Sequence, residues 1–127
     1  MVKKIKIITE ATGELIAELS EKNPKTAEAI WNALPFEASA NTWGDEIYFS
    51  IPVETGEENA QETVDMGDLA YWPPGTAMCI FFGPTPMSRG AEIRPASEVN
   101  VFGKIPVDPK VFKKVRAGSK IRVEKAE

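Results

Sequence analysis

Residues 4–19, KIKIITEATGELIAEL, open with a strict alternation of lysine and isoleucine and carry Thr12-Gly13 near their centre. Alternation with a period of two is typical of a half-buried strand, and a threonine-glycine pair supplies a turn. The stretch therefore predicts a β-hairpin. Residues 119–125, SKIRVEK, alternate in the same way at the other end of the chain. We expect the first and last strands to pair with each other, which would close the sheet into a barrel.

One helix is predicted directly after the hairpin. Asn23 suits the N-cap position and Pro24 suits the first helical position. From Ala27 onward, apolar residues recur at i, i+3, i+4 and i+7, which gives the segment one apolar face, and Pro35 ends the pattern. We expect this amphipathic helix to cover one open end of the barrel.

The rest of the chain is divided into short strand-like runs by breaks that contain Gly, Pro or Asn. A polar, acidic loop over 54–61 is expected to be mobile, and Asp108 followed by Pro109 predicts a short helical turn over 108–115. The predicted fold is mainly β: a closed antiparallel barrel with one α-helix and a short helical turn, in a single domain covering residues 1–127. The predicted strands in the middle of the chain are 36–40, 46–51, 69–72, 78–82 and 99–105.

The composition excludes several functional classes. Hydrophobic residues make up 43% and charged residues 27% of the 127 positions, which is ordinary for a globular protein. No apolar run approaches the ~20 residues of a membrane-spanning helix, and the N-terminus lacks the apolar region of a signal peptide, so we expect a cytoplasmic protein without a membrane partner. The chain has one cysteine and no histidine. Ser-His-Asp and Cys-His catalysis are therefore excluded, and we expect neither a metal site nor a cofactor.

Charge is distributed unevenly along the sequence. The net charge is −4, and residues 26–88 contain ten acidic residues and no lysine or arginine, whereas the remainder carries fifteen basic and nine acidic residues. An acidic face would repel nucleic acid, and we expect no nucleic-acid partner. The acidic region 45–68 could serve as a contact surface for another protein, or simply as solvated charge. The oligomeric state is left open.

Four fragments of the sequence, in this order, resemble motifs of the cyclophilins. They are PKTAEAIW at 24–31, GDLA at 67–70, IFF at 80–82 and VFGKI at 101–105. The chain is shorter than a typical cyclophilin and is most similar to the small bacterial and archaeal cyclophilin-like proteins of unassigned function. The resemblance implies an eight-stranded antiparallel barrel with helices at its ends, which agrees with the fold expected from the periodicity.

The resemblance also points to what this chain lacks. Cyclophilins carry Phe-x-Arg-x-x-Pro after the first helix, and that arginine is their chief catalytic residue for prolyl isomerisation. The counterpart here is IYFSIP at 47–52, which places Phe49 at the arginine position when Pro52 is used as the anchor. A fixed guanidinium stabilises the twisted amide, and phenylalanine cannot donate a hydrogen bond. Arg94 is the remaining candidate for a catalytic arginine, with an exposed loop charge as its alternative reading.

The aromatic stretch 69–84 is the remaining question. By the resemblance, Phe82 faces the proline pocket and Trp72 lies where the peptide-binding strand passes. Tyr48, Phe49 and Met87 are expected to complete an apolar, ligand-binding cleft, although each could equally be an ordinary core or loop-packing residue. We therefore expect a binding module for an apolar small molecule or a proline-containing, extended peptide, with isomerase activity lost or very weak. The alternative is a peptidyl-prolyl isomerase that uses a relocated arginine.

Overall fold

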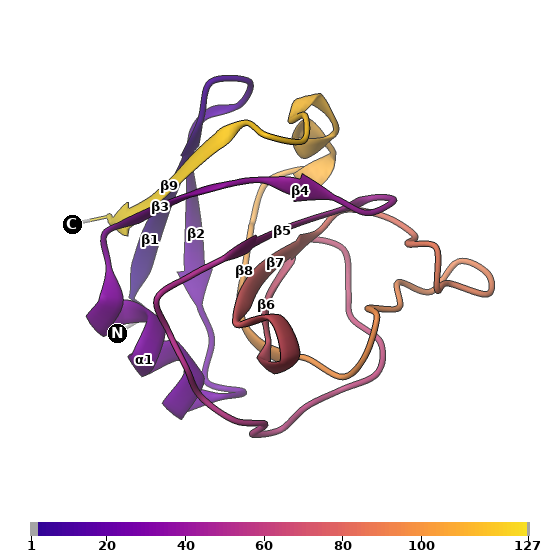
Figure 1. Ribbon diagram of the computed structural model, residues 1–127, viewed down its shortest axis with the longest axis horizontal. Helices are drawn as coiled ribbons and strands as arrows, with labels where there is room; N and C mark the ends of the chain where they lie inside the picture. The colour runs from indigo at the N-terminus through magenta and orange to yellow at the C-terminus, as the bar shows by residue number, and fades with distance from the viewer. Residues whose placement is uncertain (1–2, 127) are drawn as a thin grey trace.

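The computed structural model describes residues 3–126, which form a nine-stranded antiparallel sheet curved into a barrel (Figure 1). Neighbouring strands follow the order β3-β9-β1-β2-β8-β6-β7-β5-β4. The mainly β fold expected from the sequence is therefore confirmed. The strands are β1 (Lys4–Thr9), β2 (Gly13–Leu19), β3 (Phe36–Ser39), β4 (Asn41–Thr42), β5 (Glu46–Ser50), β6 (Asp68–Trp72), β7 (Ala77–Phe81), β8 (Asn100–Lys104) and β9 (Lys120–Lys125).

The two terminal strands pair as the sequence predicts. β1 forms a hairpin with β2, in which Lys4 is opposite Glu18, and its other edge pairs with β9, in which Ile5 is opposite Lys125. Ile5 and Ile7 are fully buried, whereas the alternating Lys4 and Lys6 are not. The alternation read from the sequence thus separates the interior of the barrel from solvent.

The barrel is closed by a single segment of chain, residues 36–42. Its first part, β3, is at one end of the sheet order and pairs with β9, and its last part, β4, is at the other end and pairs with β5. Ala40 lies between the two parts; its amide donates to Ser119 O at 2.8 Å, and its carbonyl accepts from the Gly118 amide at 2.7 Å. With β3 and β4 taken as one interrupted strand, the barrel has the eight strands that the cyclophilin resemblance implies.

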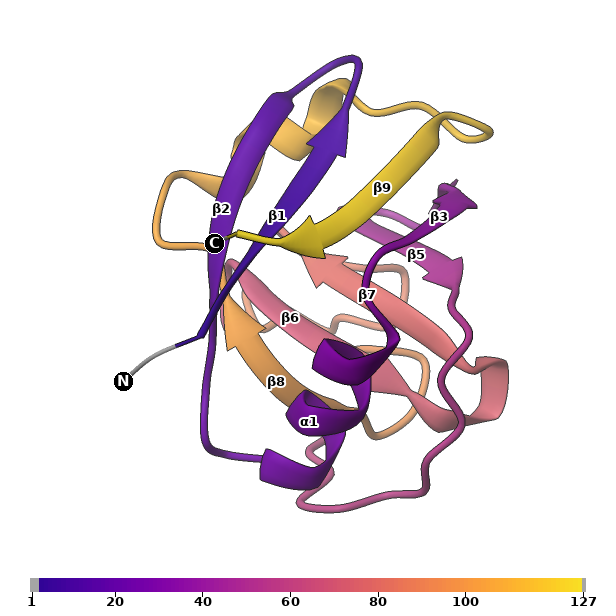
Figure 2. The ribbon, with the colours of Figure 1, turned by 90° about the vertical axis from the view of Figure 1, so that its left-hand side faces the viewer.

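Short helices cover both ends of the barrel (Figure 2). The helix α1 (Pro24–Ala33) lies across one end, with Ile30 buried, and the 3₁₀ helix η2 (Pro109–Lys114) lies across the other, with Phe112 buried. Both helices were predicted from the sequence. A second 3₁₀ turn, η1 (Pro73–Gly75), joins β6 to β7. Within residues 3–126, no helix combines the length and apolarity needed to cross a lipid bilayer.

The acidic loop 54–61 is anchored, contrary to the mobility expected from its composition. The Glu58 carboxylate accepts from the amides of Lys25 and Thr26 and so caps α1, the function that the sequence assigned to Asn23. The Asn23 side chain instead donates to Val101 O at 2.7 Å and accepts from the Asn59 amide. The helix N-terminus supplies unpaired N–H groups to a passing carboxylate, and this fixes the loop in place.

Buried side chains form two groups on opposite faces of the sheet. The larger group fills the barrel and includes Phe49 and Phe82. The smaller group, which includes Cys79, lies on the outer face of β5, β6, β7 and β8. Loops 51–67 and 82–99 cover this outer face and pair with each other at two isolated backbone bridges. This covered outer face carries the candidate site.

Candidate binding cavity on the outer face of the sheet

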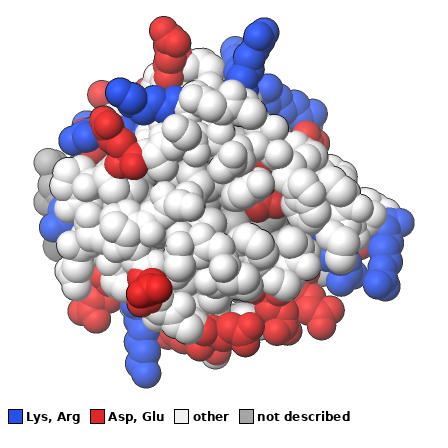
Figure 3. Space-filling view, in the orientation of Figure 1, with Lys and Arg blue, Asp and Glu red and all other residues white. Residues whose placement is uncertain are grey.

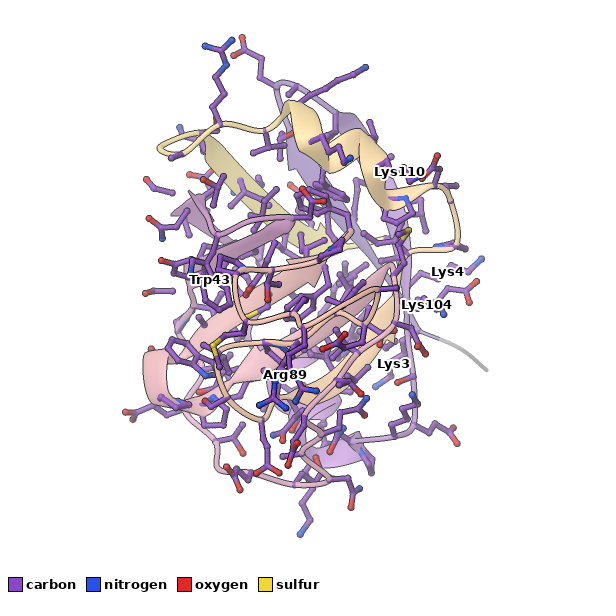
Figure 4. All side chains as sticks on the ribbon, turned by 90° about the vertical axis from the view of Figure 1, so that its right-hand side faces the viewer. Lys3, Lys4, Trp43, Arg89, Lys104 and Lys110 are labelled. Atoms are coloured by element: carbon purple, nitrogen blue, oxygen red, sulfur yellow. The ribbon has the colours of Figure 1, made fainter. Side chains whose placement is uncertain are left out.

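A cavity of about 220 Å³ lies on the outer face of the barrel, between strands β5, β6 and β7 and the end of loop 82–99. Loop 82–99 extends from the barrel at the right of Figure 1, and Figure 4 looks onto that side, where Trp43 lies beside the loop. We call this space the aromatic cavity. Its lining residues are Trp43, Glu46, Tyr48, Trp72, Cys79, Pro95, Ala96 and Val99.

Strand alternation and register place the lining side chains together. Glu46 and Tyr48 are two residues apart on β5 and therefore point to the same face of the sheet. Tyr48 lies directly opposite Cys79 on β7, so their side chains are neighbours on that face. Glu46, Cys79 and Val99 are buried and form the floor, whereas Trp43, Tyr48 and Trp72 are partly exposed and form the walls.

The tryptophan walls are held in place by local contacts. The Trp72 indole Nε1 donates to Ser97 Oγ at 2.7 Å. Its ring also lies against Gly75, where an added Cβ would be only 2.6 Å from the ring. Trp43 precedes Gly44, which has a φ of 61°, and the Trp43 amide donates to Glu46 O at 3.0 Å across this turn. The Trp72 ring is therefore held by contacts of its own, and the turn at Gly44 fixes the backbone that carries Trp43.

Glu46 is the only acidic residue among those that line the aromatic cavity. The residue is 5% exposed, and among residues 3–126 its Oε1 has no hydrogen-bond partner. Burial raises the pKa of this carboxyl from its ordinary value of 4.5 to about 7, and a hydrogen bond with the Cys79 thiol opposes the increase in part. Near neutral pH the cavity floor thus holds a carboxyl group that can gain or lose its proton.

Cys79 is a packing residue of the floor rather than a nucleophile. It is 2% exposed, and burial, together with the adjacent Glu46, raises the pKa of its thiol well above the usual value. The thiolate is the reactive form of cysteine, and this environment disfavours it. Its burial in the strand fits the role of a small apolar packing residue.

Of the six site residues expected from the sequence, the structure brings only Tyr48 and Trp72 into the aromatic cavity. Phe49 is fully buried inside the barrel, and Phe82 packs there against Phe112 with ring centroids 6.3 Å apart. The expected cleft that combined these residues with Trp72 does not form. The reason is register, because a shift of one residue along a strand moves a side chain to the opposite face of the sheet.

Met87 and Arg94 line a neighbouring cavity of about 300 Å³, which shares Pro95 and Ala96 with the aromatic cavity. The Arg94 guanidinium forms ion pairs with Glu92 Oε2 at 3.3 Å and with Glu62 Oε1 at 3.5 Å. All four arginines of the chain lie within residues 3–126, and none of them lines the aromatic cavity. The expected arginine is therefore present nearby but engaged by carboxylates.

Sequence reasoning missed Trp43, Glu46 and the Pro95-Ala96 wall. The position of Glu46 could have been inferred, because it is two residues before Tyr48 on the same predicted strand. The role of Pro95 and Ala96 carried no such signal, since it depends on how loop 82–99 folds back over the sheet. Across residues 3–126, no group of three or more potential metal-ligating side chains is found.

The architecture defines the class of protein: an antiparallel barrel with short helices across its ends and a cavity on its outer face. A family model described as cyclophilin-like matches residues 3–124, and the chain belongs to that family. A hypothetical protein from Archaeoglobus fulgidus, known from a solution structure, is 45% identical, with a TM-score of 0.83 over 98% of this chain and 95% of that one. No curated protein matches the sequence.

Proposed function

We propose that this protein is a binding module whose aromatic cavity receives one small, largely apolar group, either a whole small molecule or a side chain of an extended peptide. The cavity itself carries the proposal: about 220 Å³, with three partly exposed aromatic walls over a buried floor. An apolar cavity of about 150 Å³ is sufficient to hold benzene, and pockets for drug-sized ligands begin at about 300 Å³. The volume therefore suits a group the size of one ring or one branched alkyl.

A peptide is compatible with the surroundings of the cavity. The aromatic cavity and the cavity that contains Arg94 lie on either side of Pro95 and Ala96. An extended chain that places one side chain in the aromatic cavity would cross these two residues and bring its next polar groups toward Met87 and Arg94. This arrangement supports the peptide form of the proposal as well as the small-molecule form.

The same geometry disfavours prolyl isomerisation. Rotation about the prolyl bond must cross a barrier of ~20 kcal/mol, and a fixed donor beside the amide nitrogen lowers it. Loss of one such preorganised donor typically costs ~3 kcal/mol, or about a hundredfold in rate. Arg94 is paired with Glu62 and Glu92 and lines the other cavity. We therefore expect isomerase activity to be very weak or lost.

Binding can be tested by NMR titration with 3,3-dimethylbutan-1-ol, a small branched alcohol, and with a short proline peptide. We expect shifts of the Trp72 indole N–H and of the amides of β5. Ala96→Trp should fill the cavity and weaken binding at least tenfold, and Ala11→Trp, at an exposed position in the β1–β2 turn, should leave it unchanged. Binding that is unaffected by Ala96→Trp would contradict the proposed location.

The isomerase alternative has its own test. Exchange spectroscopy on an X-Pro peptide should show the same cis/trans rate with and without the protein. An acceleration that disappears in the Arg94→Ala variant would instead support an isomerase that uses a relocated arginine.

A further inference from the structure

We propose that the group bound in the aromatic cavity carries a positive charge, as a primary or methylated ammonium does, and that Glu46 and the walls Trp43, Tyr48 and Trp72 select it. This inference rests on the proposed function, because it requires that the aromatic cavity is a binding site. It names the chemical class of the ligand, which the apolar lining alone leaves undefined.

The walls fit a cation. Aromatic faces attract cations through their quadrupole, and several rings around one site form the cage that recognises alkylated ammonium groups. The aromatic cavity has two indoles and one phenol in its lining. Cation–aromatic contacts of this kind are present elsewhere in the protein. The ammonium groups of Lys3 and Lys125 lie 5.1 and 4.9 Å from the centroid of the Trp31 ring.

Glu46, in the floor of the aromatic cavity, is the second feature that favours a cationic ligand. A buried polar atom is normally paired, so an unpaired one needs a reason. Glu46 Oε1 is buried without a hydrogen-bond partner among residues 3–126, and no lysine or arginine of that range forms an ion pair with Glu46. Glu46 lines the aromatic cavity and has no cationic partner among residues 3–126, so its carboxylate is suited to a cation that arrives with the ligand.

The surroundings leave that role to Glu46 alone. The other titratable groups in the lining are the Cys79 thiol, from β7, and the Tyr48 phenol, from the strand of Glu46 itself. The adjoining cavity is lined by Arg89 and Arg94, and of these Arg94 is paired with two carboxylates. Figure 3 shows the acidic and basic side chains on one face of the molecule.

The pH dependence of affinity, which follows from the pKa of Glu46, distinguishes a cationic ligand from a neutral one. The carboxyl has a pKa of about 7 without ligand, and a cation binds its ionised form. The ionised fraction rises about 30-fold between pH 5.5 and pH 8, so affinity for a permanent cation should rise by about the same factor. A neutral ligand that accepts a hydrogen bond from the protonated carboxyl would show the opposite dependence.

Choline and 3,3-dimethylbutan-1-ol make a matched pair of probes, because they have the same shape and differ in charge. We expect choline to bind at least tenfold more tightly than the alcohol at pH 8, and its affinity to fall toward pH 5.5. The alcohol should bind with little dependence on pH. Both can be followed by the Trp72 indole N–H resonance and by calorimetry.

Two substitutions test the residues. Glu46→Gln should reduce choline affinity at pH 8 at least tenfold and remove its pH dependence, with little effect on the alcohol. Trp72→Leu keeps the wall apolar and should weaken choline more than the alcohol. Glu54→Gln makes the same change of charge at an exposed position and should leave both affinities unchanged. Spectra of each variant establish that it is folded.

The outcomes distinguish this inference from the proposed function. If the alcohol binds as tightly as choline, or if choline binds more tightly at pH 5.5, the inference of a cation is wrong while the cavity remains a binding site. If choline shifts resonances but Glu46→Gln leaves its affinity unchanged, the assignment to Glu46 is wrong. If neither probe shifts the resonances of the cavity, both proposals fail.

Discussion

Replacement of Glu46 by glutamine should make the protein markedly more stable at alkaline pH. Glutamine keeps the shape of the side chain and removes the charge that the buried floor disfavours. In the native protein the pKa of Glu46 is raised from 4.5 to about 7 by burial, and its Oε1 has no partner among residues 3–126. Ionisation of Glu46 is therefore less favourable in the folded protein, where the carboxylate is buried, than in the unfolded chain, where water solvates it.

The sign and size of the effect follow from this difference. Below pH 4.5 both states hold the proton, and Glu46 contributes its full stability. As the pH rises toward 7, the unfolded chain has lost the proton while the folded protein still holds it, so the contribution falls until both states are ionised. Each pKa unit corresponds to ~1.4 kcal/mol, so the total loss is about 3 kcal/mol. Glutamine does not titrate and avoids this loss.

Urea unfolding at pH 4 and at pH 8 would measure the effect. The difference in free energy of unfolding between Glu46→Gln and the native protein should shift by about 3 kcal/mol in favour of the variant between these two pH values. Asp68, whose pKa is also raised by burial, titrates in both proteins and cancels in the comparison. Glu54→Gln should show no such shift. A change below about 1 kcal/mol would mean that Glu46 is solvated and would refute the account of the cavity floor.

Three further substitutions test other parts of the structure. Gly75→Ala places a Cβ 2.6 Å from the Trp72 ring, so it should move that indole, change its fluorescence and cost about 1–3 kcal/mol of stability in thermal unfolding. Asn100→Ala removes a buried amide that donates to Thr26 Oγ1 and to Gly56 O, so hydrogen exchange over the loop 54–61 should accelerate and stability should fall by about 2 kcal/mol. Phe49→Ala should cost about 3–5 kcal/mol in urea unfolding, as an interior residue does, without selectively weakening ligand binding; a loss of binding at unchanged stability would contradict its place in the core.

The hairpin, α1 and the pairing of the two ends of the chain could be predicted because each depends on local pattern. The alternation of lysine and isoleucine in β1 defines a buried face without reference to any partner. Pro24 and Pro35 mark the two limits of the helix through restrictions on their own backbone. The pairing of β1 with β9 follows from two matching half-buried strands, whereas the barrel itself is closed by residues 36–42.

The candidate site was harder to predict because it depends on which face of the sheet each side chain occupies and on the course of the loops that cover that face. Strand alternation places neighbours such as Phe81 and Phe82 on opposite faces of a sheet, but it does not say which face is the interior. The cyclophilin resemblance assigned Phe82 to the ligand side, whereas the structure places Phe82 in the barrel. The alignment anchored on Pro52 placed Phe49 at the arginine position and, with Tyr48, in the expected cleft, but neighbours on a strand point to opposite faces and only Tyr48 lines the cavity.

The single segment that closes the barrel links the cavity to the chain ends. Residues 36–42 hold β9 through β3 and hold β5 through β4, with Ala40 bonded to the turn before β9. Glu46 and Tyr48 are on β5, so their orientation depends on a strand that ends at the C-terminus of the barrel. Truncation or fusion at that terminus would therefore be transmitted to the aromatic cavity on another part of the sheet, and the two regions would melt as one cooperative unit.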